Sequence, residues 1–201
     1  MSSPSSPPSR GRPKTVDPAH ILEVAQTAYW QRDPADVSVN EVCQLTGVSK
    51  PSLYRAFGSQ DGLTCAALDS YAEQVLSDVF ALLQADRGLR TTLEALIAFA
   101  CEDPRMASGC LFYKMRGGKH RLGPQTRSRV EELDAGARAA YAAFLQARRD
   151  AGEWPAGPSV EAGARYLSEQ VALALTQRAS GEDPAQVRET LTLALSVFTR
   201  P

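Results

Sequence analysis

The chain has 201 residues, of which 43% are hydrophobic and 22% are charged, a composition typical of a folded globular protein. Its 22 Lys and Arg nearly balance 23 Asp and Glu, and a net charge of −1 gives no chain-wide attraction to nucleic acid or anionic lipid. No apolar run approaches the ~18 residues that cross a bilayer, so no membrane span is predicted. Four cysteines are too few for a disulfide scaffold and fit a reducing cytoplasm.

Residues 1–16 are predicted to be a disordered N-terminus that carries a basic arm. The first nine are almost entirely Ser and Pro, which cannot bury a core and lack the apolar stretch of a signal peptide. Arg10, Arg12 and Lys14 follow, and no acid occurs until Asp17. This arm is the most basic stretch near the start of the chain.

From residue 17 onward apolar residues recur with the helical period, and no window alternates as a strand would. The sequence therefore predicts an all-α chain of about nine helices. Capping residues, Pro and Gly set the expected boundaries. The expected helices cover residues 18–31, 39–45, 50–57, 60–86, 89–101, 124–151, 159–179 and 184–199, with a short element after Pro104 and a basic, Gly-rich loop over 114–123.

The helix predicted over 60–86 is long enough to connect two parts of the molecule. Its apolar residues follow the three- and four-residue spacing of a regular α-helix, so they are expected to form one buried stripe. The members of this stripe are Leu63, Ala67, Tyr71, Val75, Val79 and Leu82.

The segment from Ser38 to Phe57 has the length and turn chemistry of a helix-turn-helix. Two short helices are separated by a tight turn around Gly47, a residue type that tolerates positive φ. Leu53 and Phe57 are four residues apart, as inward positions of the second helix would be. That helix can enter a DNA major groove about 12 Å wide, although an αα-hairpin facing only water shows the same pattern.

Polar residues on the other faces of the second short helix are suited to contacting DNA. Lys and Ser can donate to phosphates, Arg can read base edges, and the Tyr hydroxyl can do either. These residues are Lys50, Ser52, Tyr54 and Arg55.

Beyond the spacing, the sequence resembles the tetracycline-repressor (TetR) family of bacterial regulators over about 55 residues. The resemblance lies in Gly11-Arg12-Pro13, in the run Leu45-Thr46-Gly47-Val48-Ser49-Lys50-Pro51-Ser52-Leu53-Tyr54-Arg55-Ala56-Phe57, and in Ser59, Asp61 and Leu63 that open the next helix. It implies DNA contacts from Arg10, Arg12, Lys14, Ser38, Lys50, Ser52, Tyr54, Arg55 and Gln60.

Two positions depart from the family's pattern. Gln60 stands where the family usually has a phosphate-binding Lys, and Ala56 stands where His or Tyr is commoner. Residues 10–58 hold six Lys and Arg against five acids, so the expected attraction to DNA is modest. Lys50, Arg55 and the basic arm are expected to compensate.

The resemblance also implies three regions: the N-terminus over 1–16, a DNA-binding domain over 17–58, and an effector-binding and dimerisation domain over 59–201. The family binds palindromic operators as two-fold dimers, and the last two helices pair with their twins. Apolar residues off the buried faces of these helices are the expected dimer interface: Tyr166, Leu173, Leu193 and Val197.

The central helices are expected to enclose a small-molecule effector. Apolar surface with a few polar groups is typical of such pockets, although each of these residues also fits an ordinary core. The candidate pocket residues are Tyr71, Phe99, Phe112, Tyr113, Met115, Tyr141 and Trp154.

Together, the motif and the resemblance predict a cytoplasmic, homodimeric repressor that binds double-stranded operator DNA, is released by a small molecule and needs no cofactor or metal. One alternative is a redox- or electrophile-sensing regulator that uses Cys110, if Arg105, Lys114 and Arg116 lie close enough to lower the thiol pKa. Another is a helical enzyme or carrier with no DNA role, but no phosphate loop or nucleophile motif supports a catalytic site. The basic residues Lys114, Arg116, Lys119 and Arg121 are expected to be solvated, with an anionic ligand as the alternative.

Overall fold

The computed structural model describes residues 17–154 and 157–199, and its regular elements there are all helical. A π-helical turn, Ala72–Leu76, joins two of the helices into one rod, so the described residues hold nine helical rods. The predicted all-α class with about nine helices is confirmed. The helices are α1 (Pro18–Gln31), α2 (Val39–Thr46), α3 (Lys50–Phe57), α4 (Gln60–Tyr71), α5 (Ser77–Gln84), α6 (Leu89–Glu102), α7 (Leu111–Gly117), α8 (Pro124–Asp150), α9 (Val160–Ala179) and α10 (Pro184–Leu195).

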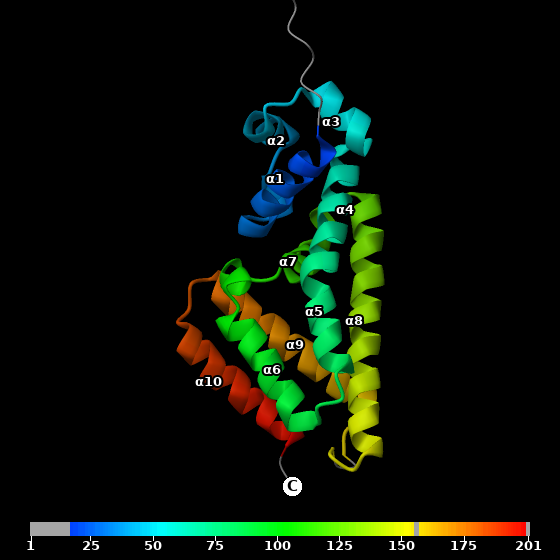
Figure 1. The fold of residues 1–201 in the computed structure, drawn as a ribbon, viewed down its shortest axis with the longest axis vertical. Coiled ribbons are helices and arrows are strands. Elements are labelled where there is room, and N and C mark those ends of the chain that lie inside the picture. Colours follow the sequence, from blue (N-terminus) through cyan, green and yellow to red (C-terminus); the bar gives the residue numbers. More distant parts are fainter. Residues whose placement is uncertain (1–16, 155–156, 200–201) are drawn as a thin grey trace, which may run out of the picture.

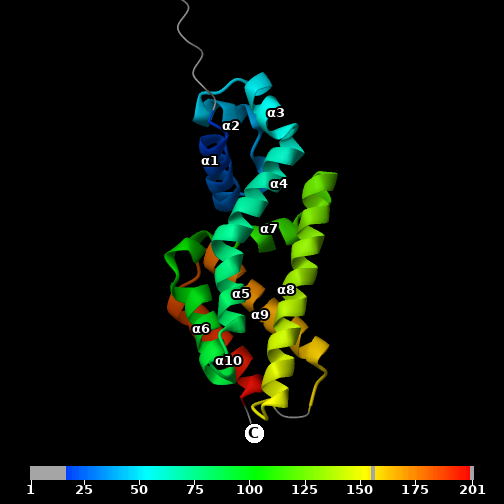
Figure 2. The same ribbon diagram turned by 45° about the vertical axis from the view of Figure 1, so that its right-hand side comes forward.

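The molecule is elongated, with the three N-terminal helices at one end (Figure 1). The rod of α4 and α5 leaves this end and runs beside α8 for most of its length, while α6, α9 and α10 gather at the opposite end. Figure 2 shows α7 between the two ends, close to the middle of the rod. No helix within 17–154 or 157–199 has the length and apolarity required to cross a membrane.

Side-chain caps begin most of these helices where the sequence predicts them. Ser38 Oγ accepts the Glu41 amide at 3.2 Å, Ser49 Oγ accepts the Ser52 amide at 3.4 Å, and Ser59 Oγ accepts the Gly62 amide at 2.9 Å. Each bond satisfies one amide that the first helical turn leaves without an intrahelical partner. These local signals explain why the expected helix starts are accurate.

The predicted buried stripe of the long rod is wrong beyond its middle. Leu63, Ala67, Tyr71 and Val75 are buried as expected, but Val79 and Leu82 are only half-buried, and Leu76 and Leu83 are buried instead. The π-helical turn adds one residue to a turn, which rotates the following face relative to a regular α-helix. A prediction that continues the regular α-helical spacing through residues 72–76 therefore places the wrong residues on the buried face of α5.

The loop predicted over residues 114–123 is also partly wrong. Residues 111–117 form α7, and a short 3₁₀ turn covers Lys119–Arg121, so Lys114 and Arg116 lie on a helix. Buried Leu111, Phe112 and Met115 anchor α7 in the core. Tertiary burial here outweighs the Gly-rich composition that favoured a loop.

Candidate nucleic-acid interface and internal cavity

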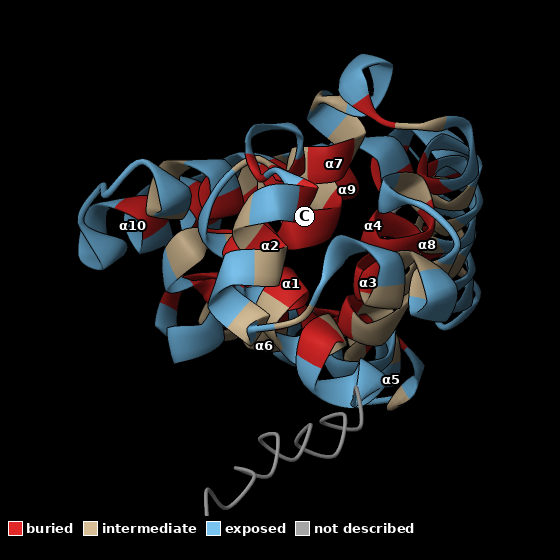
Figure 3. Ribbon diagram, turned by 90° about the horizontal axis from the view of Figure 1, so that it is seen from above, coloured by how far each residue is buried: buried red, intermediate tan, exposed pale blue. Residues whose placement is uncertain are grey.

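The N-terminal end holds two short helices joined by a tight turn, as predicted. Gly47, at the C-terminus of α2, has φ of 70°, in the left-handed region where glycine is favoured. The next two residues, Val48 and Ser49, lead directly into α3, whose inward Leu53 is fully buried. Figure 3, which looks down on this end, shows exposed residues on the outer surfaces of α2 and α3.

The residues proposed to contact DNA differ in how freely they face solvent. Lys50 and Arg55 on α3 are exposed, as are Ser38 before α2 and Gln60 in the first turn of α4. Two others are more constrained. Ser52 is half-buried with its hydroxyl 2.9 Å from Ser49 Oγ, and half-buried Tyr54 has the Lys50 ammonium 5.7 Å from its ring centroid. The predicted arm residues Arg10, Arg12 and Lys14 lie outside the described residues.

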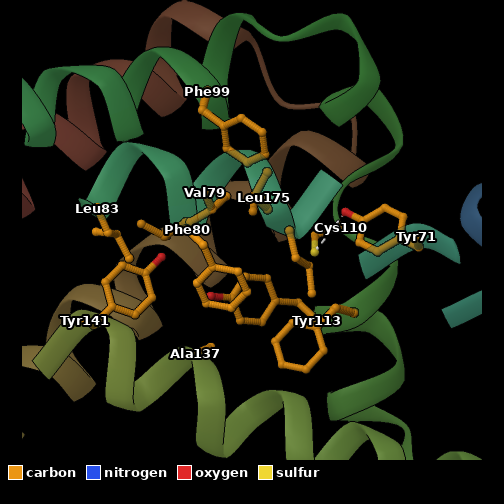
Figure 4. A pocket seen from close by; sticks show the side chains of 13 residues that line it. Tyr71, Val79, Phe80, Leu83, Phe99, Cys110, Tyr113, Ala137, Tyr141 and Leu175 are labelled. Atoms are coloured by element: carbon orange, nitrogen blue, oxygen red, sulfur yellow. Dashed lines mark hydrogen bonds between the residues drawn. The ribbon is translucent and has the colours of Figure 1, made fainter. Parts of the chain in front are cut away.

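A partly enclosed apolar cavity of about 30 Å³ is lined by residues of α4 to α9 (Figure 4). Five of the seven candidate pocket residues line it: Tyr71, Phe99, Phe112, Tyr113 and Tyr141. The other lining residues, which the sequence analysis did not select, are Leu76, Val79, Phe80, Leu83, Cys110, Ala137, Val171 and Leu175. Leu76, Val79, Phe80 and Leu83 belong to the part of the rod whose face the π-helical turn changes.

Met115 and Trp154 do not line the cavity, and their expected pocket role is corrected. Met115 is buried in the core beneath α7. Trp154 lies at the far end of the molecule, where its ring centroid is 5.8 Å from that of Phe198. The Arg149 guanidinium carbon lies 4.1 Å from the Trp154 ring centroid. Gly163 on α9 makes room for this indole, because a Cβ there would lie 2.7 Å from a ring carbon.

The Cys110 thiol is buried in the cavity wall and accepts a hydrogen bond from the Tyr71 hydroxyl at 3.1 Å. Burial raises the pKa of the Cys110 thiol and also holds the pKa of Tyr71 well above its ordinary value. Of the three basic residues expected to lower the thiol pKa, Arg105 pairs with Asp103 and Asp78, and Arg116 pairs with Asp134 and Glu169. The nearby Lys114 charge opposes the burial effect without outweighing it, so the thiol is neutral at pH 7.

The basic segment after Cys110 is engaged within the protein. Arg121 pairs with Asp33 and Asp36, and Lys119 pairs with Glu131. Lys114 donates to the carbonyl oxygen of Trp30 at 2.5 Å. Together with the two ion pairs of Arg116, these contacts leave the segment poorly suited to binding an anionic ligand.

Trp30, near the end of α1, connects the N-terminal end of the molecule to the cavity wall. Its indole Nε1 donates to the Gly109 carbonyl at 2.7 Å, and its ring meets Tyr71 edge to face with centroids 4.8 Å apart. Tyr71 in turn bonds Cys110. The sequence analysis missed Trp30, and its aromatic character at the end of an amphipathic helix was the only available signal.

The four predicted dimer residues are all exposed apolar side chains on α9 and α10 or just after α10. Their exposed fractions are 38% for Tyr166, 52% for Leu173, 65% for Leu193 and 49% for Val197. Tyr166 is partly held within the chain, since its hydroxyl donates to the Ala194 carbonyl at 3.2 Å. In the described part of the chain, only Leu45 joins them as an exposed large apolar residue.

Among the described residues, no group of three or more His, Cys, Asp or Glu side chains is placed to hold a metal ion. A Cys–His pair from Cys110 and His120 gains no support either, because Cys110 is buried while His120 is exposed. The chemistry available in the described chain is therefore that of an exposed basic helix and an apolar cavity.

Comparison with known proteins agrees with this arrangement. The family model for bacterial regulatory proteins of the tetR family matches residues 21–67, which span α1 to the first turns of α4. The repressor BdcR of Escherichia coli is 31% identical over 117 residues, which are 58% of this chain and 59% of BdcR. The match thus covers less than two thirds of that relative's length.

Solved structures extend the likeness to almost the whole fold. A TetR-family regulator from Agrobacterium tumefaciens has a TM-score of 0.80 at 18% identity, covering 91% of this chain and 97% of its own. The TetR-family regulator CifR, solved with 26-base-pair operator DNA, has a TM-score of 0.74 at 20% identity, covering 94% of this chain and 100% of its own.

The family model covers the helix-turn-helix, and the solved structures share the complete helical arrangement. The family model and the curated repressor point to a regulator rather than to an enzyme. Residues 21–67 of the chain carry the N-terminal domain of the tetR family of bacterial regulatory proteins, and the fold as a whole is that of solved TetR-family structures.

Proposed function

We propose that the chain is a transcriptional repressor that binds a palindromic operator as a homodimer and releases it when a small molecule occupies the internal cavity. The observation that carries this proposal is the helix-turn-helix whose α3 presents Lys50 and Arg55 to solvent. BdcR is named a repressor, and CifR was solved with operator DNA. Such a protein acts in the cytoplasm, where bacterial DNA lies.

The proposed DNA contacts divide into base reading and backbone contacts. Arg55 is assigned to base edges, because a guanidinium can donate two hydrogen bonds to a guanine. Phosphate contacts, which fix register but carry little sequence information, are assigned to Ser38, Lys50, Ser52, Tyr54, Gln60 and the arm residues Arg10, Arg12 and Lys14.

Dimerisation is assigned to the exposed apolar residues of α9 and α10. Leu173, Leu193 and Val197 would leave water when two copies pair, and burying them favours association. A single small DNA-binding domain reads few bases. A dimer reads two half-sites, which makes recognition of a long palindrome more specific.

Release is assigned to the connection between the cavity and α1. A molecule that displaces Tyr71 or Cys110 disturbs the Trp30 indole through the edge-to-face contact and the bond to Gly109. The two recognition helices of a dimer would then change their spacing. An affinity difference of ~1–3 kcal/mol between the two forms is sufficient for regulation.

The thiol-sensing alternative is less well supported. A reactive cysteine needs exposure and a lowered pKa, whereas Cys110 is buried and burial raises its pKa. The enzyme alternative is contradicted by the family assignment.

The proposal is tested by capturing genomic fragments with the purified full chain and measuring binding to the enriched sequence. We expect a palindrome bound at nanomolar concentration, with affinity falling steeply as salt rises because phosphate contacts release counterions. A Lys50→Ala, Arg55→Ala double variant should lose the enrichment. Enrichment of no common sequence, or of a half-site bound by a monomer, contradicts the proposal.

A further inference from the structure

We propose that the internal cavity selects an uncharged, ring-shaped molecule that carries one hydrogen-bonding group, and that it rejects both anions and cations. This inference rests on the proposed function, since it names the chemical class of the effector that the cavity would hold. It goes further in stating which side chains set that class: the Tyr113 and Tyr141 hydroxyls and the aromatic wall around them.

Charge is excluded by the composition of the wall. All the lining residues are Tyr, Phe, Leu, Val, Ala or Cys, so a bound ion would find no opposite charge. The Arg116 guanidinium lies 4.9 Å from the Tyr113 ring centroid but is paired with Asp134 and Glu169, and the Lys114 ammonium near Cys110 is bound to the Trp30 carbonyl oxygen. A charge moved from water into such surroundings without a partner loses its hydration without compensation.

A ring is favoured by the shape and chemistry of the walls. Six aromatic side chains surround the cavity, and aromatic rings pack well edge to face or offset against one another. The empty volume of about 30 Å³ holds no more than a small group, so a ring must displace a side chain. Phe80 and Phe99 are only half-buried, so they are the rings we expect to move. Phe80 also lies just after the π-helical turn, a feature often found at functional sites.

The neighbouring hydroxyls of Tyr113 and Tyr141 favour a ligand that carries one polar group. Burial raises the pKa of Tyr113 to about 12 and holds the pKa of Tyr141 well above its ordinary value, so both hydroxyls are neutral and can donate or accept. The Tyr113 hydroxyl lies 3.4 Å from Ser168 Oγ and also interacts with the hydroxyl of Tyr141, which projects from α8 (Figure 4). A hydroxyl can both donate and accept, so a ligand hydroxyl or carbonyl beside Tyr141 would add a second hydrogen bond to this pair.

Four small probes that share one ring test the inference on the full-length protein at pH 7. Toluene supplies the ring alone, benzyl alcohol adds a neutral hydroxyl, benzoate adds a negative charge and benzylammonium adds a positive charge. Binding is measured by calorimetry and by the chemical shifts of the tyrosine rings. We expect benzyl alcohol to bind about three- to tenfold tighter than toluene, the gain of one hydrogen bond, and both ions to bind at least about tenfold more weakly than benzyl alcohol.

Two variants locate the site. Tyr141→Phe should make benzyl alcohol bind no better than toluene while leaving toluene binding within about twofold, a change that a merely structural role of Tyr141 would not produce. Ala137→Leu, which fills the cavity from α8, should abolish binding of both neutral probes. Ala139→Leu places the same side chain at an exposed position of the same helix and should bind them as the wild type does.

Three binding results would overturn the inference. Benzoate or benzylammonium binding as tightly as benzyl alcohol contradicts the exclusion of charge. No binding of any probe up to its solubility contradicts a ring site, and binding that survives Ala137→Leu places the probes elsewhere. A fourth result separates the two proposals. If benzyl alcohol binds in the cavity but the protein saturated with it keeps its operator affinity, the inferred ligand class is supported and the proposed release by an effector is contradicted.

Discussion

The Asp61 carboxylate, in the first turn of α4, caps the N-terminus of a different helix, where it binds Thr126. Its Oδ1 accepts both the Thr126 amide at 3.1 Å and the Thr126 hydroxyl at 2.6 Å, and its Oδ2 accepts the Gln125 amide at 2.8 Å. Gly123 allows this approach, since a Cβ there would lie 2.3 Å from the carboxyl carbon. The family motif places an acid at this position for α4, and the fold uses it to fasten α4 to α8.

Asp61→Asn should weaken this link and destabilise the protein by ~1–2 kcal/mol at pH 7, because a neutral amide is a poorer cap for the α8 N-terminus. Burial alone would raise the pKa of Asp61, but the bonds from Thr126 and Gln125 outweigh it and lower that pKa. The stabilisation is therefore complete above the unfolded pKa of about 3.9 and is lost as the pH falls through the folded pKa. Urea unfolding of both proteins from pH 7 down to pH 2.5 measures the difference.

Asp69→Asn is the matched control for this prediction. Asp69 is also on α4 and faces α8, where it pairs with Arg129 at 2.5 Å, but both partners are partly exposed and the pair should contribute less than ~1 kcal/mol. Equal losses in the two variants at pH 7, or a difference that persists at pH 2.5, would contradict the capping role of Asp61.

Arg55→Ala should reduce operator affinity by ~1–3 kcal/mol and relax the preference at one operator position, because a lost base contact removes both energy and selectivity. Tyr54→Phe should weaken all DNA sequences about equally if the hydroxyl meets a phosphate. Binding to a set of single-base operator variants separates these two patterns. Arg90→Ala, an exposed arginine on α6, is the control and should bind as the wild type does. Unchanged affinity in both α3 variants with the fold intact would remove α3 as the reader.

Leu193→Glu should convert the dimer to a monomer, since a buried unpaired charge would oppose pairing of the apolar surfaces. It is a cleaner test than deletion of residues 183–201, because Val187, Leu191 and Leu195 of α10 belong to the core. Light scattering gives the mass of each variant, and Leu45→Glu on α2, with a similar starting exposure, is the control that stays dimeric. A dimeric Leu193→Glu protein would move the interface away from α10.

Cys110→Ser should keep both operator binding and its release, since the thiol is buried and neutral. In the native protein, iodoacetamide at neutral pH should label the half-exposed Cys43 first and Cys110 only after denaturation. Mass spectrometry of the labelled peptides makes the comparison. Release of the wild type by mild peroxide, reversed by a thiol reductant and absent from Cys110→Ser, would instead make the protein a redox sensor.

Much of the helical fold could be predicted because its signals are local. Caps such as Ser38, Ser49 and Ser59 each act on the amide three residues away, and Gly47 adopts positive φ without help from distant residues. The inward Leu53 and the exposed Lys50 and Arg55 likewise follow from the period of a single helix. The helix-turn-helix could therefore be read from neighbouring residues without reference to the rest of the chain.

Other features depend on residues far apart in the sequence, and only the tertiary structure decides them. Helix α7 forms in a Gly-rich segment because Phe112 and Met115 are buried by other helices, and the π-helical turn changes which face of α5 meets the cavity. The capping of α8 by Asp61, the contact of Trp30 with Tyr71 and the placement of Trp154 outside the cavity are likewise long-range. The sequence by itself determined the capped helix starts and the polar face of α3. Packing between helices decided where α7 forms, which face of α5 is buried and which side chains share a cavity, because burial depends on partners that no local pattern encodes.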